Sequence, residues 1–186
     1  MAVYDETQRR RMLEIARASI RHGLHSGTPL RVSVDEFEPA LRAPRATFVT
    51  LNREGRLRGC IGMLAAVRPL IEDVAENAFA AAFRDPRFPP LGAGEYDDLD
   101  VHISVLSPAV PMQFESEADL LSQMRPGVDG LILGDRGRRG TFLPSVWEQL
   151  PTRELFLAHL KQKAGLSPTH WSDTLTVERY TTESFS

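Results

Sequence analysis

One feature constrains the fold of this chain more than any other: the same series of predicted elements occurs twice. The series is a strand, a tight turn, a second strand and a helix. The two copies cover residues 46–83 and 130–163. Runs of β-branched and apolar residues predict the strands, and glycines with polar neighbours predict the turns between them. Pro69 and Pro144 mark the predicted starts of the helices, because proline is tolerated in a first helical turn. Hairpins followed by helices predict an α+β fold with largely antiparallel sheets flanked by helices.

The remaining predicted elements extend this pattern over residues 1–186, a length that fits one domain. The predicted strands cover residues 46–51, 56–61, 100–106, 130–133, 138–143 and 174–180. The predicted helices cover residues 7–22, 69–83, 116–124, 144–150 and 152–165. The two copies share little identity beyond Arg-Gly and their turn residues. Two lobes related by an internal duplication are therefore a second interpretation of the same pattern.

Charge and composition exclude several classes of protein. The net charge of -3 gives no bulk attraction to nucleic acid. The first residues are polar and lack the apolar core of a signal peptide, and the longest apolar stretch, near residues 75–83, is too short to cross a membrane. A single cysteine permits no internal disulfide, which agrees with a reducing cytoplasm. We therefore expect a cytoplasmic protein that is a monomer or a weak dimer.

The strongest candidate site is the segment of residues 57–62, which contains the only cysteine of the chain. Cys60 lies beside Gly59, two residues after Arg58 and two before Gly62. Glycine allows a ligand to approach the backbone, and a nearby guanidinium favours thiolate over thiol. On a regular strand Arg58 and Cys60 project to the same face, so they would share one pocket wall. The alternative is that Cys60 is a small buried residue and the glycines serve close packing.

Three further places carry candidate functional residues. His102, on another predicted strand, is the candidate partner base for Cys60. In the proline-rich tract after the predicted helix of residues 69–83, Asp85 and Arg87 would present charges to a substrate, or would form an ion pair within a rigid helix stop. Glu148 could act as an acid, a base or a hydrogen-bond acceptor. The alternative, which is the more common one, is that it is an exposed helical glutamate without such a role.

Familiar cofactor and metal sites are absent from the sequence. It contains no phosphate-binding glycine loop, no dinucleotide fingerprint and no nucleophile elbow. The histidines are scattered, and one cysteine cannot build a cysteine-based zinc site. An enzyme with this sequence would use a thiol, or carboxylates and arginines, without a permanently bound metal, and its cofactor is unknown.

Five motifs in order resemble the AMMECR domain family, called AmmeMemoRadiSam system protein A in prokaryotes. They are Leu57-Arg58-Gly59-Cys60-Ile61-Gly62, Asp85-Pro86-Arg87-Phe88-Pro89-Pro90, Ser104-Val105-Leu106-Ser107-Pro108, Gly127-Val128-Asp129-Gly130, and Thr141-Phe142-Leu143-Pro144 with Val146-Trp147-Glu148. The resemblance extends from the first helix to Tyr180. It implies an α+β fold of two lobes, with residues 57–62 near the cleft between them. At the position of His102 many relatives carry an acidic residue, which weakens a general catalytic role for this histidine.

The resemblance implies partners but no established reaction. The system name records association with a Memo-type protein and a radical S-adenosylmethionine protein. One hypothesis is an enzyme or enzyme component in which Cys60 is the reactive group, Arg58 tunes the thiol or holds an anionic substrate, and Asp85 and Arg87 position it. The other is a non-catalytic module that binds a small anionic ligand or a partner segment. A catalytic thiol would tolerate neither serine nor alanine at position 60, whereas a binding module would tolerate at least one.

Overall fold

The computed structural model describes residues 3–186 and divides into two compact units. The first unit runs from the start of the described chain to Leu106 and also includes Glu183–Ser186, whereas the second runs from Ser107 to Thr182. Both units contain helices and an antiparallel sheet, so the predicted α+β class is confirmed. No helix among the described residues combines the length and the apolar character needed to span a bilayer.

The first unit contains most of the helical residues. Its elements are α1 (Glu6–Ser26), α2 (Pro39–Arg42), β1 (Thr47–Arg53), β2 (Arg56–Gly62), α3 (Leu70–Phe83), β3 (Leu99–Leu106) and β8 (Thr182–Phe185), with short 3-10 turns at Val34–Glu36 and Ala93–Asp98. Asp5 caps α1 in a capping box with Gln8, and Gly27 ends it in the left-handed conformation that glycine adopts without strain. The helix is therefore one turn longer than the predicted residues 7–22.

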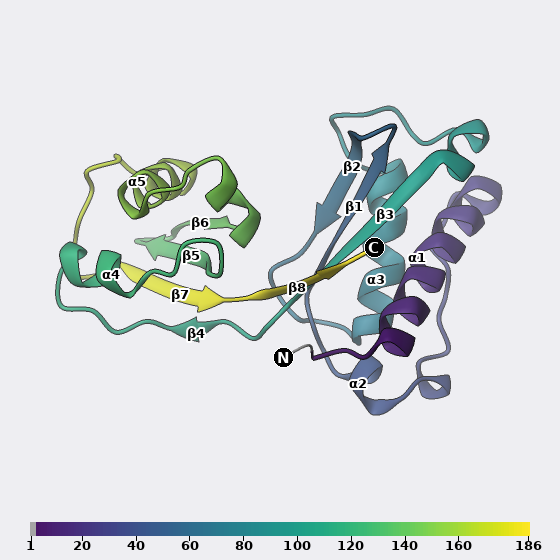
Figure 1. The fold of residues 1–186 in the computed structure, drawn as a ribbon, viewed down its shortest axis with the longest axis horizontal. Helices are drawn as coiled ribbons and strands as arrows, with labels where there is room; N and C mark the ends of the chain where they lie inside the picture. The colour runs from purple at the N-terminus through teal and green to yellow at the C-terminus, as the bar shows by residue number, and fades with distance from the viewer. Residues whose placement is uncertain (1–2) are drawn as a thin grey trace. The chain divides into compact units, whose positions relative to one another are not determined.

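The four strands of the first unit are ordered β2-β1-β3-β8. Helices α1 and α3 lie against one face of this sheet (Figure 1). Alanines of α3 allow close packing, and the core between the layers is mainly apolar. Fully buried members of this core include Met12, Ile20, Val49, Leu51, Leu70, Ile71, Val74 and Ile103.

The second unit is smaller and built around its own sheet, ordered β4-β7-β5-β6. Its elements are β4 (Val110–Pro111), α4 (Glu117–Gln123), β5 (Gly130–Asp135), β6 (Arg138–Phe142), a 3-10 helix (Pro144–Glu148), α5 (Arg153–Lys163) and β7 (Thr176–Tyr180). The indole of Trp147 stacks on the Phe156 ring with centroids 3.9 Å apart. The predicted helix over residues 144–150 is thus a single 3-10 helix, which turns Trp147 into this core.

The two units share one order of elements. In each, a hairpin is followed by a helix, and a later strand returns beside the first hairpin strand, giving β2-β1-β3 in one sheet and β6-β5-β7 in the other. Both hairpin turns place a residue and the following glycine at positive φ, Glu54-Gly55 and Arg136-Gly137. This is the twist that two-residue hairpin turns require.

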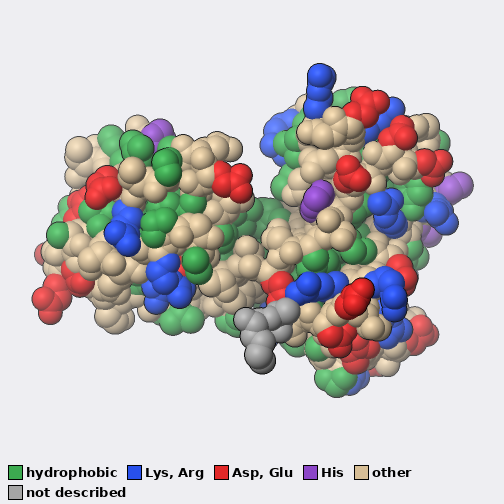
Figure 2. All heavy atoms as spheres, in the orientation of Figure 1, with side chains coloured by type: hydrophobic (Ala, Val, Ile, Leu, Met, Phe, Trp, Pro, Cys, Tyr) green, Lys and Arg blue, Asp and Glu red, His purple; other side chains and the backbone are tan. Residues whose placement is uncertain are grey.

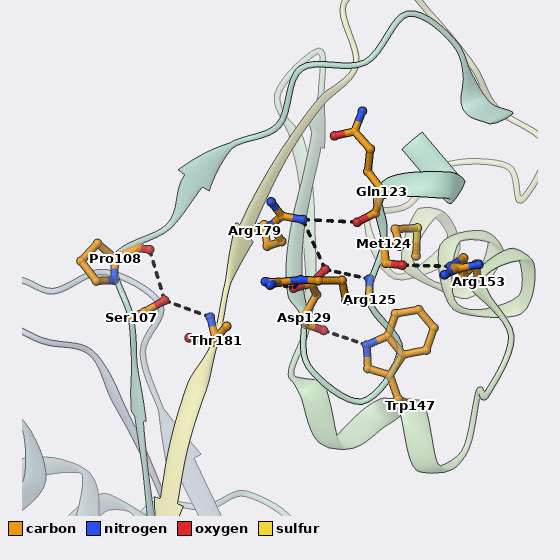
Figure 3. A network of polar contacts seen from close by, with 10 residues as sticks. All are labelled: Ser107, Pro108, Gln123, Met124, Arg125, Asp129, Trp147, Arg153, Arg179 and Thr181. Atoms are coloured by element: carbon orange, nitrogen blue, oxygen red, sulfur yellow. Dashed lines mark hydrogen bonds and ion pairs between the residues drawn. The ribbon is translucent and has the colours of Figure 1, made fainter. Parts of the chain in front are cut away.

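The fourth strand of each sheet comes from a chain segment that leaves the other unit. The chain runs from β3 through Ser107 into β4, and from β7 through Thr181 into β8. The Ser107 backbone N–H donates to the Thr181 carbonyl at 2.8 Å, and the Thr181 N–H donates to Ser107 Oγ at 2.9 Å (Figure 3). These two bonds join the two crossing segments.

Charged side chains are mixed on the surface. On the face drawn in Figure 2, acidic and basic groups alternate and do not separate into one basic area. This distribution matches the small net charge of -3. That face therefore offers no extended positive surface of the kind that binds nucleic acid.

Candidate functional site

The hairpin of β1 and β2 is irregular, and its irregularity sets the geometry around the cysteine. The register shifts after Leu51, so that Arg58 has no partner across the strand pair. Beyond this bulge, Thr50 lies opposite Cys60 on β2, and on its other side it lies opposite His102 on β3. Directly opposite residues project to the same face of a sheet. Cys60, Thr50 and His102 therefore form one row across three strands, which we call the Cys60 row.

The Cys60 row lies on the face of the sheet that points away from α3. Val49 and Leu51, the neighbours of Thr50 in β1, are fully buried in the helix-covered core. Thr50, Cys60 and His102 are only half-buried, as expected for alternate positions on a strand with one covered face. The thiol, the hydroxyl and the imidazole are therefore presented together on the other face.

Within this row the thiol contacts a hydroxyl group. Thr50 Oγ1 lies 3.1 Å from Cys60 Sγ, a hydrogen-bonding distance for sulfur. Because neighbouring strands are about 4.8 Å apart, the backbones of Cys60 and His102 are separated by about 10 Å. The structure thus places the predicted pair on one face, with Thr50 between them.

Asp85 and Arg87 hold the backbone of Cys60 at the outer edge of β2. The buried Asp85 carboxylate accepts the Cys60 N–H at 2.9 Å, and Arg87 Nη2 donates to the Cys60 carbonyl at 3.4 Å. Arg87 also pairs with Asp85 through Nη2 at 2.7 Å and Nε at 3.0 Å. These bonds from the Arg87 side chain, with those from the Cys60 and Arg87 backbones, hold the pKa of Asp85 far below its usual range. The second motif therefore completes the hydrogen bonding of an edge strand formed by the first.

The guanidinium of Arg58 is bound by a different carboxylate. Its Nε and Nη2 donate to the two oxygens of Glu95 at 2.8 and 3.0 Å, and Nη2 also donates to the Pro89 carbonyl at 3.0 Å. Hydrogen bonding from Arg58, followed in size by the Gly92 N–H, lowers the pKa of Glu95 to about 2. Because the bulge breaks the alternation of β2, the expectation of a regular strand shared by Arg58 and Cys60 is wrong. The charge of Arg58 is instead balanced by Glu95.

The two glycines of the segment make close internal contacts. A Cβ added at Gly59 would lie 2.1 Å from the carbonyl oxygen of Ala81 in α3. One added at Gly62 would lie 2.3 Å from the ring of Phe48. The absence of a side chain at both positions therefore serves the approach of other parts of the first unit.

The fourth and fifth motifs meet in the second unit. The Trp147 indole N–H donates to the Asp129 carbonyl at 2.8 Å (Figure 3). The fully buried Asp129 carboxylate accepts Arg125 Nη2 at 2.6 Å and lies 3.7 Å from Arg179 Nη1. Glu148, next to Trp147, is exposed and makes no side-chain hydrogen bond or ion pair within residues 3–186. The motif residue that is anchored here is the tryptophan rather than the glutamate.

Sequence reasoning missed three residues that organise these places, Thr50, Glu95 and Asp129. Asp129 stood inside a recognised motif, and its position before a glycine and a buried strand was the available signal. Thr50 and Glu95 gave no such signal, because their roles depend on the bulge and on the fold of the segment after Pro90. Within the described residues, His, Cys, Asp and Glu side chains form no group of three or more suited to a metal ion.

The Cys60 row combines three different hydrogen-bonding groups, a thiol, a hydroxyl and an imidazole. The nearest guanidinium groups, Arg58 and Arg87, are each paired with a carboxylate. Each of these groups can take part in hydrogen bonds with a polar partner. The row can therefore recognise polar groups on a partner that lies across the sheet face.

The fold and the motif contacts define a class of protein, an α+β chain of two units in which residues of separate sequence motifs are hydrogen-bonded to one another in each unit. The chain belongs to the AMMECR1 family, whose family model matches residues 13–185. The resemblance drawn from the five motifs is thereby confirmed.

Known relatives agree with this assignment over most of their length. A protein of Methanothermobacter thermautotrophicus is 44% identical over 164 residues, which cover 86% of this chain and 83% of the relative. A protein of Thermococcus gammatolerans is 37% identical over 185 residues, covering 94% of this chain and 87% of the relative. The crystal structure of an uncharacterized protein, PH0010, from Pyrococcus horikoshii is similar with a TM-score of 0.83 and 34% identity, covering 94% of this chain and 88% of that one.

Proposed function

We propose that this protein is a non-catalytic binding module, and that the Cys60 row is the centre of its binding face. The observation that carries the proposal is the alignment of Cys60, Thr50 and His102 on the face of the sheet away from α3. All three residues are half-buried, and their backbones are fixed by the sheet. This arrangement favours the binding of a partner over a chemical reaction at the row.

The geometry gives less support to a thiol-dependent reaction. A nucleophilic cysteine is usually activated by a neighbouring base or cation. Here Thr50 is the side chain in contact with the sulfur, and Arg58 and Arg87 are bound to Glu95 and Asp85. The Thr50 contact is the one observation that keeps the thiol hypothesis as a second candidate, since a hydroxyl can hydrogen-bond to a thiolate.

A protein segment is the occupant that fits this face best. Small-molecule sites are usually concave, whereas a row across three strands is part of a nearly flat surface. The resemblance to the AmmeMemoRadiSam system supplies the candidates, a Memo-type protein and a radical S-adenosylmethionine protein, acting with this chain in the cytoplasm. We propose that one of them lies across the Cys60 row.

The single cysteine makes a direct test possible. Purified Memo-type and radical S-adenosylmethionine proteins from the same organism are added separately, and the rate of Cys60 alkylation by iodoacetamide is followed by mass spectrometry. We expect one partner to slow alkylation at least about tenfold. In the control variant Cys60→Ala/Glu14→Cys the only thiol lies on the exposed side of α1, and its alkylation should be unchanged.

The same experiment separates binding from catalysis. In the proposed role, at least one of the variants Cys60→Ser and Cys60→Ala keeps the affinity for the partner within about threefold in calorimetry. Complex formation without any protection of Cys60 would place the binding face elsewhere. Recovery of a covalent adduct on Cys60 in the presence of a partner, lost in both variants, would establish the thiol reaction instead.

A further inference from the structure

The second unit contains a hollow of its own, lined by residues of that unit alone. Strands β4 and β7 are paired at Pro111 and Glu178, and the Met112 N–H donates to the Val177 carbonyl at 2.8 Å. After Met112 the chain leaves β7. The space that opens between residues 113–115 and 171–176 has a volume of about 570 Å³. This volume lies within the range of small-molecule pockets.

Part of the lining of the hollow is apolar and aromatic, and the rest is polar. Met112, Leu175 and Val177 form its buried floor. Phe114 and Trp171 line it from opposite chain segments, with ring centroids 5.6 Å apart and planes tilted by 58°. Two aromatic rings in this arrangement offer a surface to a flat apolar group.

Trp171 is held in place before any ligand arrives. The buried Asp135 carboxylate accepts His170 Nε2 at 2.6 Å, Ser172 Oγ at 2.8 Å and Thr174 Oγ1 at 2.6 Å, which fixes the segment on both sides of the tryptophan. Lys161 Nζ lies 5.6 Å from the centroid of the Trp171 ring. A wall that is already ordered costs a ligand little entropy on binding.

The charged groups that line the hollow are all acidic. They are Glu115, Asp173 and Glu178, and no lysine, arginine or histidine of residues 3–186 lines it. Glu178 is paired with Arg139 at 3.3 Å. The carboxylates of Glu115 and Asp173 make no side-chain hydrogen bond or ion pair within the described chain. Two unpaired carboxylates beside an aromatic wall complement a cation with an apolar body.

We propose that this hollow binds a small organic cation, a primary ammonium group attached to an aromatic or flat apolar body. The body packs against the paired rings of Phe114 and Trp171 and over Met112. The ammonium group is placed at Glu115 and Asp173 rather than on the Trp171 ring, because Lys161 already occupies the neighbourhood of that ring. This inference is independent of the function proposed for the Cys60 row.

Nuclear magnetic resonance gives the first test, with 2-phenylethylammonium as the probe and the neutral, similarly shaped 2-phenylethanol as the matched compound. The chain has two tryptophans and so two indole N–H signals, assigned with Trp171→Phe. We expect the ammonium compound to shift the Trp171 signal in a saturable way. The alcohol should require at least about tenfold higher concentration, and the signal of the buried Trp147 should stay in place.

Isosteric variants test the role of the carboxylates. Glu115→Gln/Asp173→Asn should weaken binding of the ammonium compound at least about tenfold, whereas Glu148→Gln, at an exposed carboxylate elsewhere in the unit, should leave it unchanged. Equal binding of amine and alcohol, an unaffected double variant, or a shift that never saturates would each overturn the proposal. A lysine-containing peptide that binds at least about tenfold more tightly than the small amine would do so too, because the site would then belong to a protein partner.

Discussion

The carboxylate of Asp85 accepts the backbone N–H of Cys60 at 2.9 Å, although the two residues belong to different motifs. This bond satisfies a donor on the free edge of β2, which would otherwise be exposed for pairing with another chain. The ion pair within the Asp85-Pro86-Arg87 turn was one of two interpretations of the sequence, and it is present at 2.7 Å. It serves at the same time to hold the strand that carries the cysteine.

Replacing this carboxylate by an amide should destabilise the protein. Asp85→Asn removes the negative charge and replaces one of the two acceptor oxygens, which serve Cys60 and Arg87, by an NH2 donor, while keeping the shape of the side chain. We expect the free energy of unfolding to fall by about 3 kcal/mol, since a buried partner of a charged group is lost. Urea denaturation measures the change. Asp97→Asn, at an exposed position, is the control and should change it by less than about 0.5 kcal/mol.

The ion pair of Glu95 and Arg58 should make the free energy of unfolding depend on pH. The pKa of Glu95 is lowered to about 2 in the folded protein, against about 4.3 in an unfolded chain. Its contribution is therefore present above about pH 5 and is lost as the pH falls through about 2. The stability difference between the wild type and Glu95→Gln should shrink over this window. A difference that stays constant, as expected for the exposed control Glu14→Gln, would contradict the role of the ion pair.

Close packing at Gly59 should tolerate no side chain. Gly59→Ala would put a methyl group 2.1 Å from the Ala81 carbonyl oxygen, so α3 would have to move away from the sheet. We expect a loss of about 3 kcal/mol or more in thermal or chemical unfolding. Gly94→Ala is the matched control, because nothing lies within 4 Å of an added Cβ there and its backbone is not left-handed. Similar stability of the two variants would exclude this packing contact as the reason for glycine.

Asparagine at the first position of each hairpin turn should stabilise the folded protein. Glu54 has a φ of 52° and Arg136 a φ of 48°, a conformation that asparagine adopts more readily than either residue. Glu54→Asn and Arg136→Asn should each raise the free energy of unfolding by about 0.5 kcal/mol. Glu54→Val should lower it, because a β-branched residue is strained at positive φ. An equal effect of asparagine and valine would argue against the turn geometry.

Local sequence patterns predicted most of the helices and strands. The features that they did not predict depend on contacts between residues far apart in the sequence. Proline and glycine punctuation located the hairpins and the helices, whose observed bounds lie within a few residues of the predicted ones. Counting outward from the turn at Glu54-Gly55, an ideal hairpin would have set Thr50 opposite Gly59. The bulge at Arg58 sets it opposite Cys60 instead. No local signal predicts this shift, and the bulged residue Arg58 is bound by Glu95, which is 37 residues further along the chain.

Strands β4 and β8 were also missed, for a related reason. Val110–Pro111 is too short to show alternation, and Thr182–Phe185 is mostly polar. Each is a strand because it pairs with a neighbouring strand, β4 with β7 in one sheet and β8 with β3 in the other. Such edge strands are determined by their partners more than by their own residues.

The exchange of fourth strands affects the order in which this protein can be built. During synthesis the residues of β1, β2 and β3 emerge early, but β8, their remaining neighbour, follows about eighty residues later. Until then the edge of β3 is an open template for another chain. Nearly the whole second unit must therefore be synthesised before the first sheet is complete. A nascent chain stalled after residue 106 would expose the edge of β3 and would be a substrate for chaperones.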